Sequence, residues 1–195
     1  MKQHSEFVII GGGVLGASLA YQLSLHGREV LLRSPEAADA QALLDNMRVT
    51  SGETHFMARY QEECQATVEQ ETGFIEALTG HPQNFMIVAM LSGELVGGCS
   101  VMAMSGHIKT RHRGSLGISV EQKAWGGLGT AMIEAALRQA KENGFEQVEL
   151  GVFEDNSHAR HLYEKLGFQE QGRTLRAFRL KDGTYRDEIQ MVKFL

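Results

Sequence analysis

The sequence predicts an α/β (α+β) fold for a chain of 195 residues. Three observations support this prediction. Hydrophobic residues make up 43% and charged residues 22% of the chain, a balance that suits a packed core and excludes disordered and collagen-like classes. The spacing of apolar residues changes repeatedly between the helical period and the period of two that marks strands. No apolar run approaches the roughly 20 residues that a membrane helix needs.

The charge balance and the cysteines narrow the classes of function. Nineteen Lys and Arg against 24 Asp and Glu give a net charge of −5, which does not favour nucleic acid as the partner. Cys64 and Cys99 are too few for a disulfide framework or a cysteine-only metal site, so we expect no metal. The start of the chain does not resemble a cleaved signal. We therefore expect a cytoplasmic protein with neither a nucleic-acid nor a membrane partner.

The start of the chain predicts a βα unit followed by a short strand. Residues 7–10 are apolar and lead into a glycine-rich turn at residues 11–16, which fits the G-x-G-x-x-G pattern between a strand and a helix. The following apolar residues recur at helical spacing. They predict a helix over residues 14–26 that crosses over to a parallel strand at residues 29–33.

Residues 6–32 resemble the opening of FAD-dependent amine and amino-acid oxidases, in which Ile-Ile-Gly-Gly-Gly precedes the first helix. In that family an acidic residue at the end of the second strand binds the ribose. Here Arg33 takes the place, a residue that suits a 2′-phosphate instead. Because the rest of a doubly wound sheet is missing, we expect this unit to pack on the main domain and expect neither FAD nor NAD. Dinucleotide binding through Gly11, Gly13 and Gly16 remains an alternative.

The rest of the chain predicts elements that alternate between helix and strand. Ser34 and Pro35 favour a helix start, and Gly167 favours a helix end. The first predicted elements are a helix from residue 34 with Leu43, Leu44 and Met47 on its buried side and a loop over 48–66. Residues 68–71 then lead into a helix that carries Phe74, Ile75 and Leu78 and that Gly80 and Pro82 close. Strands at 85–91 and 95–104, a loop over 105–113 and a strand at 115–120 come next. They are followed by a helix over 130–144, a strand at 147–153, a helix over 157–166, and a hairpin of strands at 174–180 and 188–194.

Four motifs in the second part of the chain occur in the order that they have in one enzyme family. They are residues 33–39, residues 114–120, Trp-Gly-Gly-Leu-Gly-Thr-Ala at 125–131, and residues 156–168, where Asn, Ala, Leu-Tyr, Lys and Gly-Phe keep the family spacing. On these motifs, residues 29–195 resemble the GNAT superfamily of acyl-CoA-dependent N-acetyltransferases. The resemblance implies a central mixed, mostly antiparallel twisted sheet flanked by helices. Residues 1–28 would then be an N-terminal βα extension.

The resemblance implies that an acetyl group moves from acetyl-CoA to a primary amine of a small molecule or peptide by direct attack. Such an enzyme positions both reactants, polarises the carbonyl, takes a proton from the amine and protonates the leaving thiolate. Glycines allow backbone amides to approach the pyrophosphate, and a helix N-terminus adds a favourable dipole. The residues implied to bind acetyl-CoA are Ile118, Ser119, Val120, Trp125, Gly126, Gly127, Leu128, Gly129, Thr130, Asn156 and Tyr163.

Tyr163 and His112 are the catalytic residues that the resemblance favours. Tyr163 lies where many relatives carry the tyrosine that protonates the thiolate, although a core tyrosine on an amphipathic helix is the alternative. Ser115 takes the position of the glutamate that serves many relatives as general base. His112 is therefore a candidate base, since imidazole is suited to this role near neutral pH, and a solvated loop histidine is its alternative. Glu149 and Glu154 are further candidates.

Departures from the family pattern leave a rival function open. Ala124 stands where relatives have Arg or Gln, and the glycine turn that follows is one residue shorter than the usual form. These features favour, as the alternative, a GNAT-fold module that binds CoA with little catalysis. In the final hairpin, Asp187 and Glu188 are either contacts for a cationic amine or surface charges. A homodimer through the N-terminal edge strand or the final hairpin is also left open.

Overall fold

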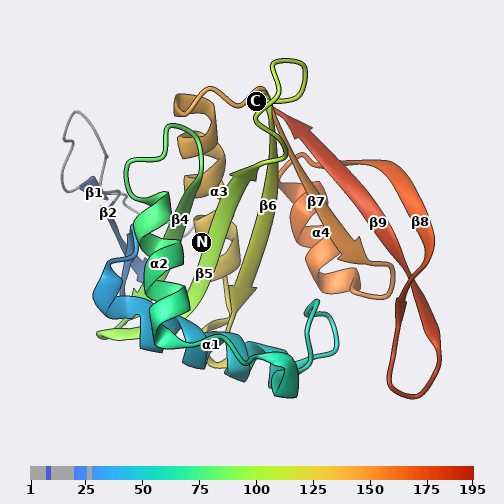
Figure 1. Ribbon diagram of the computed structural model, residues 1–195, viewed down its shortest axis with the longest axis horizontal. Coiled ribbons are helices and arrows are strands. Elements are labelled where there is room, and N and C mark those ends of the chain that lie inside the picture. The colour runs from blue at the N-terminus through green and yellow to red at the C-terminus, as the bar shows by residue number, and fades with distance from the viewer. Residues whose placement is uncertain (1–7, 10–19, 26–27) are drawn as a thin grey trace, which may run out of the picture.

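The structure is a computed structural model that describes residues 8–9, 20–25 and 28–195 (Figure 1). The strands of these residues form one nine-stranded sheet in the order β1-β2-β3-β4-β5-β6-β7-β9-β8. Neighbouring strands are antiparallel except β6 and β7, which are parallel. The prediction of a mixed, mostly antiparallel sheet is confirmed.

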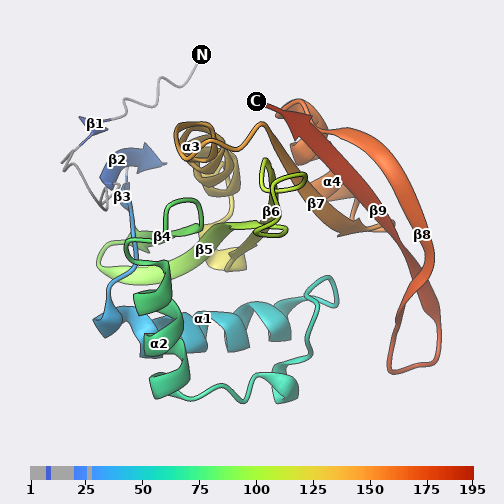
Figure 2. The same ribbon diagram turned by 45° about the horizontal axis from the view of Figure 1, so that its top comes forward.

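From β3 onward the described strands and helices follow the predicted order. The strands are β1 (Val8–Ile9), β2 (Ala20–Leu25), β3 (Arg28–Arg33), β4 (Phe85–Leu91), β5 (Glu94–Ala103), β6 (Arg113–Val120), β7 (Gln147–Phe153), β8 (Gln169–Arg179) and β9 (Tyr185–Phe194). The α-helices are α1 (Ala40–Glu53), α2 (Val68–Leu78), α3 (Leu128–Glu142) and α4 (Ser157–Lys165). Figure 2 shows α1 and α2 on one face of the sheet and α3 on the other.

Buried side chains fill both faces of the sheet. The larger cluster joins the strands to α3 and α4 and includes Met132, Ile133 and Tyr163. The smaller cluster places Leu43 of α1 and Ile75 of α2 against the strands β4 and β5. The sheet is thus held rigidly from both sides, which fixes the positions of the strand ends where a site can form.

The predicted helix over residues 14–26 is wrong at residues 20–25, which form β2. This strand pairs antiparallel with β3, and β1 pairs antiparallel with β2, so the predicted parallel crossover to residues 29–33 is wrong as well. The stretch Tyr-Gln-Leu-Ser-Leu also alternates apolar and polar residues, and this period of two prevails over the helical spacing. Residues 10–19, which include the glycine pattern, lie outside the described residues.

The first well-defined helix begins later than predicted. Glu36 caps a short 3₁₀ turn, in which Asp39 accepts a hydrogen bond from the Glu36 amide, and α1 starts at Ala40. Asp39 also binds the guanidinium of Arg33 through two hydrogen bonds of 2.6 and 2.8 Å. These two hydrogen bonds hold the Arg33 side chain against the 3₁₀ turn. At its other end α1 continues to Glu53, through the first part of the predicted loop.

Candidate active site

The parallel strands β6 and β7 pair only at their first residues. Three register pairs join them, and the last is Ser115 with Glu149. Beyond that point the strands separate toward their C-terminal ends (Figure 1). A cleft of about 850 Å³ opens between them, lined by residues 116–120 of β6 and residues 151–153 of β7. The backbone of β6 faces this cleft without a strand partner from β7.

An ion pair closes the narrow end of the cleft, where the two strands still pair. Arg113 donates to both carboxylate oxygens of Glu149 at 2.5 and 2.7 Å, and Gln147 and Gln171 also donate to this carboxylate. These hydrogen bonds, above all those of Arg113, lower the pKa of Glu149 to about 2 against the cost of burial. Glu149 is therefore a structural carboxylate with little basicity, and it does not line the cleft.

The glycine turn and the start of α3 form one wall of the cleft. Gly126 and Gly127 have φ angles of 112° and 114°, which an L-residue with a side chain rarely adopts. Gly127 is the N-cap of α3, so no side chain caps the first amides of this 15-residue helix. Trp125 fixes the turn to β6 because its indole NH donates to the Val120 carbonyl at 3.0 Å. Uncapped helix amides beside a cleft are suited to binding an anion.

Helix α4 supplies the opposite wall. Asn156 caps the helix by accepting a hydrogen bond from the Ala159 amide at 3.2 Å. Tyr163 lines the cleft, with 8% of its surface exposed. Burial, with a smaller effect from Cys99, raises its pKa to about 12. Within the described part of the chain the Tyr163 hydroxyl has no hydrogen-bond partner, so it remains protonated and able to donate to a ligand.

The structure brings almost all of the predicted cofactor residues to this cleft. Leu128 is the exception, because its side chain is 1% exposed and belongs to the core under α3. Their roles remain predictions. The predicted residues that line the cleft are Ile118, Ser119, Val120, Trp125, Gly126, Gly127, Gly129, Thr130, Asn156 and Tyr163.

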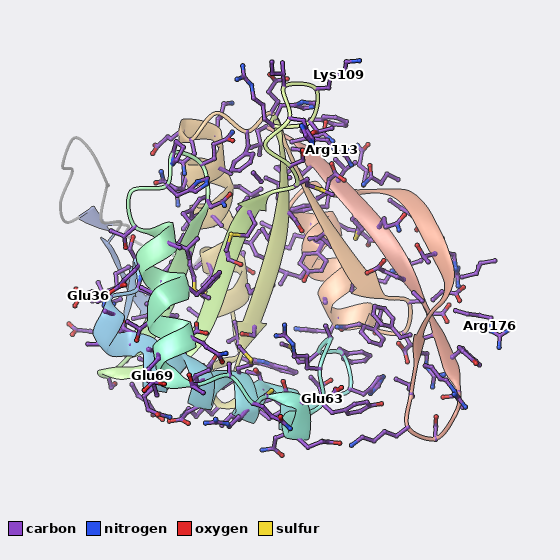
Figure 3. The ribbon with its side chains drawn as sticks, in the orientation of Figure 1. Glu36, Glu63, Glu69, Lys109, Arg113 and Arg176 are labelled. Carbon is purple, nitrogen blue, oxygen red and sulfur yellow. The ribbon has the colours of Figure 1, made fainter. Side chains whose placement is uncertain are left out.

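The structure does not bring the predicted base His112 to the cleft. His112 precedes Arg113, which Figure 3 shows at the end of β6 away from the glycine turn, and none of residues 105–113 lines the cleft. The His112 carbonyl instead accepts from the amides of Glu146 and Gln147. Glu154, another candidate base, is bound by Arg173 and the Asp187 amide. His112 precedes the residues at which β6 and β7 still pair, so the loop over 105–113 lies at the opposite end of these strands from the cleft.

Aromatic residues that the sequence analysis did not single out form the remaining wall. Phe153 of β7 stacks on Phe178 of β8 with ring centres 3.8 Å apart, and Phe56 meets Phe153 edge to face at 5.8 Å. Met57 lines the cleft beside Phe56. The apolar pair Phe56 and Met57 within a polar stretch was the signal available in the sequence. Glu188 also lines the cleft, as one of its two interpretations required.

A comparison with protein-family models matches residues 44–168 to the acetyltransferase (GNAT) family. The chain belongs to the GNAT family. It is 29% identical over 123 residues to the L-amino acid N-acetyltransferase AaaT of Escherichia coli K12, a match that covers 60% of this chain and 73% of that protein. The resemblance drawn from the four motifs is confirmed, and the chain is a GNAT N-acetyltransferase.

Solved GNAT structures share the fold. A GNAT-family acetyltransferase from Streptococcus pneumoniae superposes with a TM-score of 0.82 at 28% identity, covering 86% of this chain and all of that one. The yncA protein of Salmonella typhimurium, a putative acetyltransferase solved with its cofactor acetyl-CoA, superposes with a TM-score of 0.75 at 18% identity, covering 85% of this chain and 94% of that one. Among the described residues of this GNAT protein, no helix combines the length and apolar character needed to cross a bilayer.

Proposed function

We propose that this GNAT N-acetyltransferase moves an acetyl group from acetyl-CoA to a primary amine by direct attack. The observation that carries the proposal is the start of α3, where two glycines of positive φ and uncapped helix amides face the cleft between β6 and β7. A diphosphate is the anion that such a turn suits, because several amides converge on it without intervening side chains.

The charges that line the cleft favour one direction for the cofactor. The cation Lys165 comes from α4, as do the imidazoles of His158 and His161, which can donate hydrogen bonds, whereas the carboxylates Glu53 and Glu188 come from α1 and β9. A polyanionic carrier is attracted to the walls formed by α3 and α4 and repelled from the carboxylate side. The unpaired edge of β6 lies between these two sides, so it can offer backbone hydrogen bonds to the amides of the pantetheine arm.

Tyr163 is suited to protonate the leaving thiolate. Tyr163 lines the cleft, and its hydroxyl is held protonated by burial and makes no hydrogen bond within the described part of the chain. A phenol that donates to sulfur as the carbon–sulfur bond breaks stabilises the charge that develops there. Asn156 and Ile118 line the same cleft and are proposed to hold the pantetheine arm.

The proposal is tested by release of free CoA from acetyl-CoA with a panel of primary amines, followed by a thiol reagent and by mass spectrometry of the acetylated product. Turnover with at least one amine is the expected result. Calorimetry with CoA is run on the same preparation. Binding of CoA without turnover of any amine would identify a CoA-binding module instead, and absence of CoA binding would refute the proposal altogether.

A further inference from the structure

The end of the cleft formed by the segment after α1 and by β7, β8 and β9 is lined by rings and by the carboxylate of Glu188. Phe56, Phe153 and Phe178 form a contiguous aromatic group, with Met57 beside it. These side chains come from three separate parts of the chain, which are β7, β8 and the segment that follows α1. Apolar walls around a single charged group are typical of a site that binds a small organic molecule in one orientation.

Glu188 reaches this end of the cleft because residue 151 has no side chain. Glu188 of β9 pairs with Phe153 of β7, which places its side chain diagonally next to Gly151. A Cβ at position 151 would lie 2.8 Å from the Glu188 carboxyl carbon and would overlap one carboxylate oxygen. The carboxylate therefore occupies the space that any other residue at 151 would fill.

The carboxylate of Glu188 has no hydrogen-bond or ion-pair partner among residues 29–195. The other carboxylate that lines the cleft, Glu53, accepts a hydrogen bond from the Gln122 amide at 2.9 Å. A half-buried carboxylate beside aromatic rings loses part of its hydration, and a cation that enters the cleft can replace it. Glu188 is thus available for an ammonium group, and the neighbouring rings add cation–π attraction.

Most cationic side chains around the hairpin of β8 and β9 are already occupied. Arg176 lies over the Tyr185 ring at 3.9 Å, at the outer edge of the hairpin (Figure 3). Arg173 is bound by Asp187 and Glu154, Arg186 by Asp155, and Lys181 by Glu62, while Lys193 donates to the Leu166 carbonyl. Arg179 has no such partner among the described residues, but it is exposed, follows Phe178 on the strand and does not line the cleft. No cationic side chain of the hairpin lines the cleft, so a substrate carboxylate at this end would meet Glu188 and the rings.

We propose that this end of the cleft binds a primary ammonium group carried on an apolar or aromatic body without a carboxylate, and that Glu188, seated against Gly151, accepts its proton. The inference rests on the proposed function and adds the acceptor class and the general base to it. Glu188 is the catalytic base in this assignment, since its carboxylate contacts the reacting nitrogen.

The reaction balances with one proton released. A primary ammonium, which is the dominant form near pH 7, first gives a proton to Glu188, and the nitrogen lone pair then forms a bond to the thioester carbon. The carbon–sulfur bond breaks and the sulfur takes its electron pair and a proton, which Tyr163 supplies. The nitrogen loses a second proton, which is transferred through solvent to the Tyr163 phenolate and restores the phenol. Glu188 passes the first proton to solvent as the amide product leaves.

The acceptor class is tested with two probes that differ only in a carboxylate, phenethylamine and L-phenylalanine. The apolar body is the same in both, so the comparison isolates the carboxylate. We expect kcat/KM for acetylation to be at least 10-fold higher for phenethylamine, since the carboxylate of phenylalanine faces Glu188. Equal or faster turnover of L-phenylalanine would overturn the acceptor class, and so would turnover of other amines in the panel but not of phenethylamine.

The role of Glu188 is tested by Glu188→Gln, which keeps the size of the side chain and removes its charge. We expect kcat/KM with phenethylamine to fall by about 10²-fold or more. The affinity for CoA in calorimetry should stay unchanged. Glu76→Gln is the matched control, because Glu76 is exposed on α2 and outside the cleft. Turnover by Glu188→Gln at the rate of the control would overturn the assignment.

The contact between Glu188 and Gly151 is tested by a substitution that leaves Glu188 itself unchanged. Gly151→Ala introduces a methyl group into the space of the Glu188 side chain, which has to shift. We expect turnover to fall at least 10-fold, with CoA binding retained. Gly73→Ala in α2, where a Cβ meets nothing within 4 Å, is the control for a glycine substitution. Normal turnover by Gly151→Ala would show that the contact does not position Glu188.

These outcomes separate the inference from the proposed function. If no amine of the panel is acetylated by the unmodified protein, the proposed function fails. If amines are acetylated while Glu188→Gln and Gly151→Ala behave like their controls, the proposed function stands and the inference alone is refuted.

Discussion

Two carboxylates on neighbouring strands show how position decides chemistry. Glu149 of β7 is surrounded by Arg113, Gln147 and Gln171, which hold it ionised and leave it little affinity for a proton. Glu188 of β9 has no such partners in the described part of the chain and faces the cleft. Both are glutamates at strand positions, and the sequence alone offers no way to distinguish the structural one from the one available for chemistry.

The lowered pKa of Glu149 predicts an acid-sensitive part of the stability. Since the pKa falls from 4.5 to about 2 on folding, this carboxylate stabilises the fold fully above pH 4.5 and loses the contribution as the pH falls toward 2. We expect Glu149→Gln to be less stable than the unmodified protein at pH 7, with the difference shrinking between pH 4.5 and 2. Urea unfolding at several pH values measures this, and a difference independent of pH would contradict it.

Tyr163→Phe tests the proposed acid. Removal of the hydroxyl breaks no hydrogen bond to a described residue and leaves the packing against Phe168 in place, so the protein should fold normally. We expect turnover to fall by about 10²-fold or more while the affinity for acetyl-CoA barely changes. CoA release and calorimetry measure the two quantities. An unchanged turnover would remove Tyr163 from the mechanism and leave it as a core residue.

At the scale of the elements, the start of α3 joins fold and function. Its N-cap is Gly127, whose φ is in the left-handed region, and no side chain caps the first amides of the helix. The side-chain oxygen of the usual Ser, Asp or Asn cap would accept a hydrogen bond from one of the first amides of the helix. The helix therefore forgoes a stabilising cap, and its amides stay available to the cleft.

Gly127→Ala is expected to weaken both the fold and the cofactor site. The φ of 114° costs a residue with a Cβ about 1–2 kcal/mol, so the free energy of unfolding should fall by that amount. Relaxation of the turn should also lower the affinity for CoA. Denaturant unfolding and calorimetry measure the two effects. Gly73→Ala, inside α2, should instead be neutral or stabilising, because alanine is the better helix former.

The elements that the sequence predicted well are those with one dominant pattern. Phe85–Leu91 and Gln147–Phe153 have the predicted bounds, and α2 carries the predicted Phe74, Ile75 and Leu78. Where two patterns compete, the prediction failed. Residues 20–25 fit both periods, and pairing with β3 decides for strand. Ser34 and Pro35 are typical of a helix start, but Asp39 bound to Arg33 moves it to Ala40.

At the scale of the whole molecule, the site depends on contacts that the chain order does not reveal. The motifs around the glycine turn and α4 placed the cofactor residues in one cleft, because each motif is local. The acceptor side joins Phe56, Phe153, Phe178 and Glu188, which are separated by up to 132 positions in the chain. Strand register brings Phe153, Phe178 and Glu188 together, and the segment after α1 adds Phe56. Register also places His112 at the end of β6 away from the cleft.

CoA should stabilise the whole fold if it binds the native state alone. At a CoA concentration 100 times the dissociation constant, the gain is about 2.7 kcal/mol. For a chain of this size that corresponds to a rise in Tm of about 5–10 °C. Thermal unfolding over a series of CoA concentrations measures it, with adenosine as the control that lacks the diphosphate. A Tm that does not depend on CoA would contradict binding at the glycine turn.

Because β6 and β7 pair over only three residues, the width of the cleft depends on the angle between these two strands. The two strands are joined at Arg113, Gly114 and Ser115. From there to Val120, a length of about 17 Å at the usual rise of a strand, β6 pairs with β5 and no longer with β7. A small rotation of β6 relative to β7 where the two strands pair produces a much larger change in the width of the cleft near Val120. Substitutions beside the Arg113–Glu149 pair therefore offer a way to tune which molecules fit, from a distance and without altering any wall of the cleft.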